Sequence, residues 1–176
     1  MAASASLIGP AQRVGLIAAL AVAALDQAVK AWLLFGFDVE ERGRVALTPF
    51  LDLVLAWNTG ISFGMFQQAG PVGQWALFAL KAIAVVLLGL WLVRTRSRLS
   101  GLALGLIIGG AIGNAVDRVV HGAVMDYVLF HVAATGWTFQ WSIFNLADAA
   151  IVGGVIGLLY ESLFAGAPQK RPDVYQ

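Results

Sequence analysis

The amino-acid sequence predicts an all-α membrane protein with four transmembrane helices and a small extracytoplasmic β-containing segment. Of the 176 residues, 60% are hydrophobic and 12% are charged, whereas a soluble domain carries about 25% charged residues. The mean hydropathy is +0.82, and the apolar excess runs through the whole chain. These observations exclude a soluble globular protein, and we expect residues 1–176 to form a single integral membrane domain.

Four apolar stretches reach the length of about 20 residues that a membrane-spanning helix needs. They cover residues 14–35, 71–93, 101–120 and 142–164. The loop between the second and third stretches contains Arg94, Arg96 and Arg98. Because basic residues collect in cytoplasmic loops, this loop and both chain ends are predicted to be cytoplasmic.

The two outer segments, residues 36–70 and 121–141, then lie on the extracytoplasmic side. In the first of them, short β-branched and aromatic runs are broken by Pro49 and by Asn58-Thr59-Gly60. Such runs between turn residues are typical of strands. We therefore expect strands and turns on the membrane surface in residues 36–70, and not a fifth span.

Glycines recur at intervals of four residues along the third predicted span and again in the fourth. They are Gly101, Gly105, Gly109 and Gly113, followed by Gly153 and Gly157. Because glycine has no side chain, such a stripe lets two helix backbones approach closely in lipid. The stripes predict helix interfaces, within one chain or between chains, and we expect a monomer.

Several kinds of chemistry are excluded by composition. The chain contains no Cys, which excludes disulfides, thiolate catalysis and Cys-ligated metal. It has two His and no HExxH-like cluster, so we expect neither a metal nor another cofactor. Its 11 basic and 10 acidic residues nearly balance, so no nucleic-acid partner is expected.

Five carboxylates fall in the outer half of the predicted membrane region or at its surface. They are Asp26, Asp52, Asp117, Asp126 and Asp148. An ionised carboxylate at the bilayer centre costs about 2.5–3.5 kcal/mol, so such groups normally face a partner or a polar cavity. Their common depth predicts one polar cavity that opens towards the outer leaflet.

Two of these acids have a cation close by in the sequence. Asp26 and Lys30 are four residues apart and share one helix face. Asp117 precedes Arg118 directly, on a face that also carries Asn114. We expect Asp26–Lys30 and Asp117–Arg118 to be structural ion pairs.

Asp126 and Asp148 have no obvious cation nearby in the sequence. Two facing carboxylates share one proton, because like charges raise one of the two pKa values. The ionised member can then take a proton from water while the protonated member polarises a carbonyl, as in aspartic proteases. A proton relay in a small proton-coupled transporter uses the same residue type, and the spacing alone leaves both interpretations open.

Four sequence blocks carry a resemblance to a known family. They are DQAVK from Asp26, NTGISFGMF from Asn58, GGAIGNAVDRVVHGAVMDYV from Gly109 and FNLADAA from Phe144. In this order and spacing the chain resembles the lipoprotein signal peptidases (signal peptidase II) of bacterial inner membranes. The resemblance implies a membrane aspartyl endopeptidase with four helices, a small extracytoplasmic sheet, a helix covering the site, and an active site near the periplasmic leaflet.

The resemblance also implies substrates and residue roles. Similar proteins remove the signal peptide from diacylglyceryl-modified prolipoproteins, cutting just before the lipidated Cys, and are inhibited by the cyclic peptide globomycin. The implied catalytic pair is Asp126 and Asp148. The implied substrate-binding or site-supporting residues are Asn58, Gly60, Asn114, Arg118 and Asn145, and the implied structural polar residues are Asp26, Lys30 and Asp117. No role is predicted for Lys81, Asp52 or residues 129–141.

Overall fold

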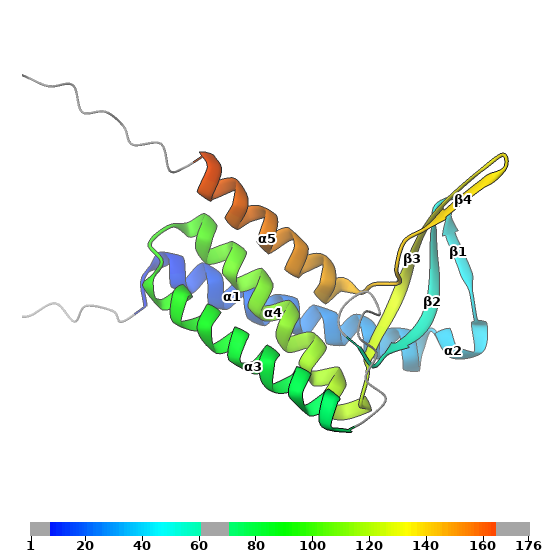
Figure 1. Ribbon diagram of the computed structural model, residues 1–176, viewed down its shortest axis with the longest axis horizontal. Coiled ribbons are helices and arrows are strands. Elements are labelled where there is room, and N and C mark those ends of the chain that lie inside the picture. Colours follow the sequence, from blue (N-terminus) through cyan, green and yellow to red (C-terminus); the bar gives the residue numbers. More distant parts are fainter. Residues whose placement is uncertain (1–7, 61–70, 165–176) are drawn as a thin grey trace, which may run out of the picture.

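The computed structural model describes residues 8–60 and 71–164. Four long helices lie side by side, and a four-stranded sheet extends from one end of them (Figure 1). The helices are α1 (Pro10–Ala31), which continues into a π-helical turn (Trp32–Gly36), the short α2 (Val39–Arg42), α3 (Pro71–Arg94), α4 (Arg98–His121) and α5 (Leu146–Phe164). The strands are β1 (Val45–Thr48), β2 (Leu51–Asn58), β3 (Val124–Ala134) and β4 (Trp137–Gln140).

Three of these helical segments are long and apolar enough to cross a membrane: Pro10–Gly36, Arg98–His121 and Leu146–Phe164. They confirm the first, third and fourth predicted spans as long apolar helices, with ends displaced by a few residues. The start of α5 is displaced to Leu146, because Asn145 caps the helix. The second predicted span is helical as α3.

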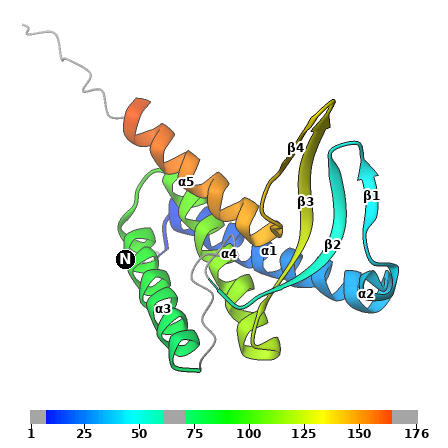
Figure 2. The same ribbon diagram turned by 45° about the vertical axis from the view of Figure 1, so that its right-hand side comes forward.

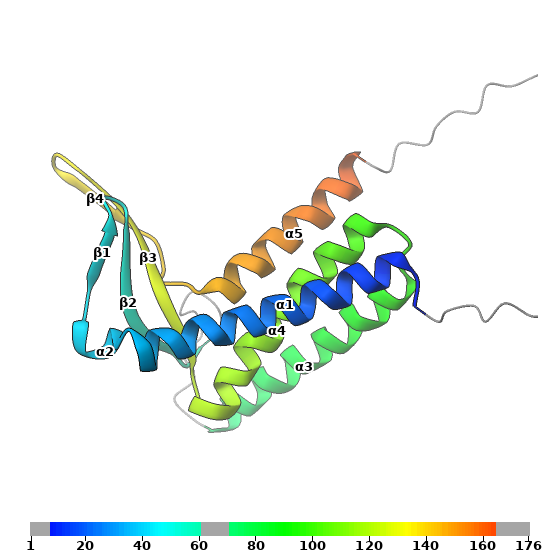
Figure 3. The ribbon, with the colours of Figure 1, turned by 180° about the vertical axis from the view of Figure 1, so that it is seen from behind.

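The glycine stripe of α4 packs against α1, which crosses it in the view from behind (Figure 3). A Cβ on Gly109 would lie 2.5 Å from the Ala19 carbonyl oxygen, and one on Gly113 would lie 2.6 Å from Asp26 Oδ2. The predicted interface is therefore confirmed, and it lies within one chain. In α5, Gly157 faces α4 as predicted, since a Cβ on it would lie 3.2 Å from the Ala103 Cβ. Gly153 does not, and Gly154 takes its place, with a Cβ that would lie 2.5 Å from the Ala103 carbonyl oxygen.

The sheet joins both outer segments in the order β1-β2-β3-β4, with every neighbouring pair antiparallel. The strands expected in residues 36–70 are confirmed as β1 and β2. The expectation was incomplete, because residues 129–141 also belong to strands, the end of β3 and β4. The pairing of β3 with β2 spans about 70 residues and leaves no local signal. The hairpin of β3 with β4 is local, and its turn at Thr135-Gly136 could have indicated it.

A small apolar core anchors the sheet to the end of α1. Leu33 of the π-helical turn, Val39 of α2, Leu53 of β2, and Met125 and Tyr127 of β3 form this buried cluster. Side chains alternate along a strand, so the residue between Met125 and Tyr127 is turned towards the opposite face. The sheet therefore presents Asp126 of β3 to the ends of α4 and α5. Helix α4 passes between α3 and α5 (Figure 2).

Candidate active site

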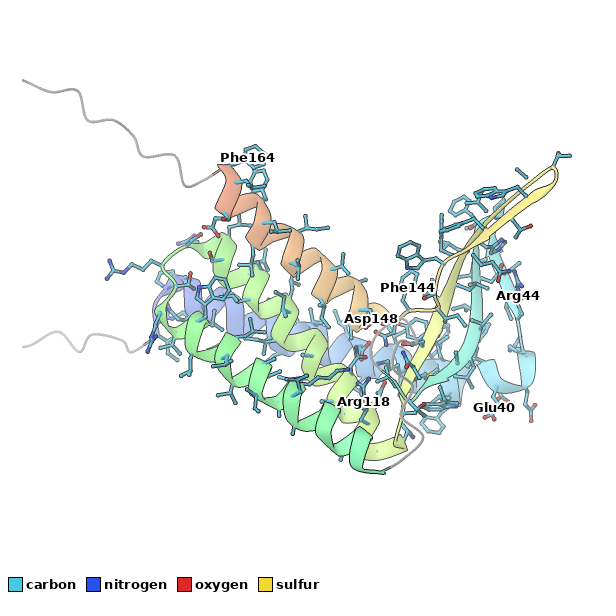
Figure 4. The ribbon with its side chains drawn as sticks, in the orientation of Figure 1. Glu40, Arg44, Arg118, Phe144, Asp148 and Phe164 are labelled. Carbon is cyan, nitrogen blue, oxygen red and sulfur yellow. The ribbon has the colours of Figure 1, made fainter. Side chains whose placement is uncertain are left out.

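The carboxylates of Asp126 and Asp148 both contact one buried residue, Asn145. Asn145 Nδ2 donates a hydrogen bond to Asp126 Oδ1 at 2.7 Å, and the Asn145 backbone N–H donates to Asp148 Oδ2 at 3.4 Å. All three residues are buried, at the end of the helices next to the sheet, where Figure 4 labels Asp148. The structure therefore brings together the two acids that have no cation nearby in the sequence.

Asp148 is held by the first turn of α5. Asn145 Oδ1 accepts the Asp148 backbone N–H at 2.9 Å, while the Asp148 carboxylate accepts the Asn145 N–H. This reciprocal capping box fixes the acid relative to the helix end. Asn114 Nδ2 from α4 donates to the second oxygen, Asp148 Oδ1, at 2.9 Å. The spacing Asn145-x-x-Asp148 is the signal in the sequence that predicts such a cap.

Asp126 is placed by the pairing of β2 with β3. Ala56 lies opposite Asp126 in the sheet, and Asn58, two residues further along β2, lies on the same face. Asn58 Nδ2 donates to Asp126 Oδ2 at 3.1 Å. Both carboxylate oxygens of Asp126 therefore accept a hydrogen bond from a side-chain amide, one from the sheet and one from the start of α5.

Burial raises the pKa of the Asp126 carboxyl to about 6. The charge of Asp148 raises this pKa further, whereas the hydrogen bonds from Asn58 and Asn145 oppose the rise by stabilising the ionised form. An ordinary aspartate has a pKa of about 3.9. Asp126 is therefore suited to keep the proton that two neighbouring carboxylates share.

Arg118 joins α4 to the end of β2. Its Nη2 donates to the Gly60 carbonyl oxygen at 3.0 Å and its Nη1 to the Asn114 carbonyl oxygen at 3.0 Å. The Gly60 N–H donates in turn to Asn58 Oδ1 at 2.9 Å. All the predicted supporting residues thus lie around the two acids. The rest of the NTGISFGMF block, residues 61–66, lies outside the described residues. The helix predicted to cover the site was expected in residues 36–70, where the described part has only the short α2 beside the sheet, and residues 61–70 lie outside the described residues.

A second buried cluster is centred on Lys30. Its Nζ lies 2.7 Å from Asp26 Oδ2 and 2.7 Å from Asp117 Oδ2. Asp26 Oδ1 accepts the N–H of Ala147 in the first turn of α5 at 3.1 Å. Asp117 Oδ2 accepts the N–H of Met125 in β3 at 3.0 Å. The Lys30 cluster therefore ties α1, α4, α5 and β3 together behind the acids.

The predicted ion pair Asp26–Lys30 is confirmed, and the predicted pair Asp117–Arg118 is wrong. Adjacent residues of a helix leave it about 100° apart, so their side chains have different neighbours. Asp117 pairs with Lys30 of α1, whereas Arg118 contacts the end of β2.

Sequence reasoning missed two further residues. Gln27 Nε2 donates to Asp117 Oδ1 at 2.8 Å, and its place directly after Asp26 could have drawn attention to it. The Tyr127 hydroxyl oxygen accepts the N–H of Leu146 at 3.2 Å, and burial raises the pKa of this hydroxyl to about 12. No local pattern indicates that Tyr127 supports the end of α5.

Asp52, to which the sequence assigned no role, belongs to the sheet. Arg44 Nη2 lies 2.5 Å and His131 Nε2 lies 3.0 Å from Asp52 Oδ2. Burial acts to raise the pKa of Asp52, but hydrogen bonds from Arg44 and His131 outweigh it and hold the pKa below its ordinary value. Arg44 is labelled beside β1 in Figure 4, away from Asp148. Asp52 therefore stabilises the sheet and lies apart from the candidate site.

The described residues contain no group of three or more His, Cys, Asp or Glu side chains placed to hold a metal ion. The arrangement instead offers two hydrogen-bonded carboxyl groups, one on a strand and one on a helix. Such a pair can activate water and polarise a carbonyl.

Comparison with known proteins identifies the family. The model of the family described as signal peptidase (SPase) II matches residues 18–164. The chain belongs to the signal peptidase II family. This is a family of aspartic-type peptidases, so the chain is an enzyme, and the proton-coupled transporter that the acids alone left open is set aside.

Relatives support the same family over nearly the whole chain. The lipoprotein signal peptidase of Nitrobacter hamburgensis is 59% identical over 160 residues, which are 91% of this chain and 98% of that protein. The lipoprotein signal peptidase of Rhodopseudomonas palustris strain TIE-1 is 53% identical over the same shares of the two chains. The signal peptidase II described here is therefore a bacterial membrane protein with several long apolar helices.

Solved structures share its fold. A bacterial membrane enzyme determined by the in meso method at 2.3 Å resolution superposes with a TM-score of 0.73, covering 93% of this chain and 95% of that one. A second such structure, at 1.9 Å resolution, gives a TM-score of 0.68. Each is 23% identical in sequence to this signal peptidase II, so the likeness concerns the fold alone.

Proposed function

We propose that this signal peptidase II removes the signal peptide from diacylglyceryl-modified prolipoproteins, cutting before the lipidated Cys, with Asp126 and Asp148 as the catalytic pair. The observation that carries the proposal is the shared contact of both carboxylates with buried Asn145. The names of the relatives support the substrate class, since they are lipoprotein signal peptidases.

The raised pKa of Asp126 and the position of Asp148 in the first turn of α5 support different roles for the two acids. Asp126, whose pKa is raised to about 6, donates its proton towards the scissile carbonyl oxygen. Asp148, at the positive end of the α5 dipole, acts as the carboxylate that takes a proton from water. Water then adds to the carbonyl carbon, the C–N bond breaks, and the leaving amine takes up a proton. The products are a signal peptide with a new carboxyl end and a lipoprotein with a free amine on its Cys.

An apolar cavity beside Asp148 is suited to binding the lipid of the substrate. It has a volume of about 400 Å³ and runs along α5 past Val152, Gly153 and Ile156, with Trp141 and Phe144 at the end near the sheet. Acyl chains bind to such apolar surfaces through the burial of their methylene groups, each worth about 0.8 kcal/mol. We propose that this cavity accepts part of the diacylglyceryl group.

The same proposal includes the orientation in the inner membrane. The start of α1, the loop between α3 and α4 and the end of α5 all lie at the end of the helices away from the sheet (Figures 1 and 3). The arginines of that loop favour a cytoplasmic position, which puts the sheet and both acids towards the periplasmic leaflet. With 24 residues, α3 is about 36 Å long and can serve as the fourth span of a core about 30 Å thick.

The test of the substrate class compares two forms of one precursor. We expect the diacylglyceryl-modified precursor to be cleaved and the same precursor without the lipid to be cleaved at least tenfold more slowly at equal concentration, because it loses the apolar contacts. Mass spectrometry of the products gives the cleavage position. Equal cleavage of the two forms, or cleavage at another bond, would contradict the proposal.

Gly153→Leu tests the apolar cavity. A Cβ on Gly153 would meet nothing within 4 Å, so the variant should fold while its side chain fills the cavity. We expect KM for the lipidated precursor to rise several-fold with the midpoint of thermal unfolding unchanged. The matched control is Gly89→Leu on α3, where a Cβ also meets nothing within 4 Å and no part of this cavity is affected.

Asn58→Ala tests the proton on Asp126. The hydrogen bond from Asn58 lowers the pKa of Asp126 by stabilising the ionised form, so its removal should raise that pKa. The protonated form then persists to higher pH, and the alkaline limb of the pH–rate profile should shift to higher pH. Initial rates measured against pH for both proteins show the direction. If the alkaline limb stays at the same pH or moves to lower pH, the proton that limits the rate is not the one on Asp126.

Three further expectations accompany the proposal and stay predictions. They are inhibition by globomycin, action as a monomer, and a single peptidase domain over residues 1–176. The site itself supports the last of these, because it draws on residues from Asp26 in α1 to Asp148 in α5.

A further inference from the structure

Lys81 is a cation in the middle of α3 for which neither the fold nor the proposed reaction accounts. Together with Arg118 of α4 it lines a cavity of about 290 Å³ between the two helices. The remaining lining is apolar, from Ala82 and Val85 on α3 to Ala111 and Ala115 on α4. An ammonium group in such surroundings is costly, and buried charges are normally paired.

No carboxylate in the described part of the chain forms an ion pair with Lys81. The charges that act on it are the positive charge of Arg118 and, in the opposite sense, those of Asp148 and Asp126. Two cations thus face one apolar cavity, within electrostatic reach of both proposed catalytic acids. This arrangement is suited to an anion that is present only during part of the reaction cycle.

Peptide hydrolysis creates such an anion at this place. When the C–N bond breaks and the C–O bond forms, the signal peptide acquires a terminal carboxyl group, whose ordinary pKa of about 3.3–3.7 leaves it ionised near neutral pH. The aspartates repel this new charge. Lys81 and Arg118 attract it, and the apolar cavity beside them accepts the hydrophobic end of the peptide.

We propose that Lys81 and Arg118 bind the new carboxylate of the released signal peptide, which makes this peptide a charge-dependent product inhibitor. The inference rests on the proposed function, since it uses the position of the bond that is cut. A lipid phosphate is a less suitable ligand, because Lys81 lies ten residues into α3, about 15 Å from the first residue of that helix. In the proposed orientation, with α3 as the fourth span, that depth is below the headgroup level, where phosphates lie.

The experiment uses two synthetic signal peptides of one sequence, ending at the cleavage position with either a free carboxylate or an amide. Their Kd values are measured with the full chain in neutral detergent. We expect the wild-type protein to bind the carboxylate form about tenfold more tightly, as one charge-assisted contact would give. The preference should be clearly reduced in Lys81→Met, which retains only Arg118, and persist in Lys81→Arg.

The matched control is Arg96→Gln, which removes one positive charge from an exposed residue in the loop at the far end of the helices. It should keep the preference. Equal binding of the two peptides by the wild-type protein, or a preference that is undiminished in Lys81→Met, would overturn the inference. Binding of phosphatidylglycerol that depends on Lys81, without discrimination between the peptides, would assign the cations to a lipid headgroup instead.

The two proposals fail in different ways. If the protein cleaves the lipidated precursor but binds both peptides equally, the proposed function holds and this inference is wrong. If the protein prefers the carboxylate peptide but cleaves no precursor, the proposed function is wrong. The two results are independent, because the peptide-binding measurement requires no turnover.

Discussion

Asp126→Asn should abolish processing of a lipidated precursor, and so should Asp148→Asn. Neither variant can share a proton between two carboxyl groups, and loss of general acid–base catalysis costs roughly 10²–10⁴-fold in rate. The measurement is single-turnover cleavage of one lipidated precursor in detergent or vesicles. Because the two acids act as a unit, the double variant should be little slower than either single variant.

Loss of activity in these variants must be separated from loss of structure. In Asp126→Asn, the new amide oxygen can still accept the hydrogen bond that Asn145 donates to Asp126, but the new NH2 group faces Asn58 Nδ2, which donates to the other oxygen of Asp126. We therefore expect the free energy of unfolding to fall by about 0.5–1.5 kcal/mol, the contribution of one hydrogen bond, which leaves the protein folded. The control is Asp38→Asn, an exposed acid with φ of 56°, a conformation that Asn tolerates. Normal processing by either dyad variant would show that the catalytic assignment is wrong.

Lys30→Met should produce the largest loss of stability. The substitution leaves the carboxylates of Asp26 and Asp117, each 2.7 Å from Lys30 Nζ, buried without their shared cation. Removing one partner of a buried ion pair costs about 3–5 kcal/mol, and here two acids lose the same partner. The measurement is the free energy of unfolding in a denaturing-detergent titration.

Two controls show whether the loss comes from charge. Lys81→Met makes the same substitution at a lysine without an ion pair among the described residues, and we expect stability to stay the same or to rise, because an unpaired ammonium leaves apolar surroundings. The triple variant Asp26→Asn/Lys30→Met/Asp117→Asn removes all three charges and should recover part of the loss, since neutral replacement of a buried ion cluster is often tolerated. Recovery should be incomplete, because Asp26 and Asp117 also accept backbone N–H groups. A Lys30→Met protein as stable as the wild type would show that the cluster contributes nothing.

The sequence predicted those parts of the site in which the interacting residues are close together in the chain. Asp126 and Asp148 stood out because they lack a nearby cation, and Asp26–Lys30 stood out because residues four apart share a helix face. The same local reasoning failed at Asp117, where the adjacent Arg118 looked like a partner and the actual partner is Lys30 of another helix. Adjacent side chains on a helix diverge, so proximity in sequence was misleading there.

The sequence by itself determined that this protein lies in a membrane, where its long helices are, and which acids are candidates for catalysis. Apolar length and residue type decide these properties, and both are read directly from the chain. Only the tertiary structure decided that β3 pairs with β2, that Asn145 joins the two acids, and that Lys81 faces the cavity shared with Arg118. Most of these contacts join residues far apart in the chain: Asn145 and Asp126 are 19 positions apart, and Leu51 of β2 and its partner Phe130 of β3 are 79 positions apart. Packing of whole helices and strands creates them, so no local pattern contains them.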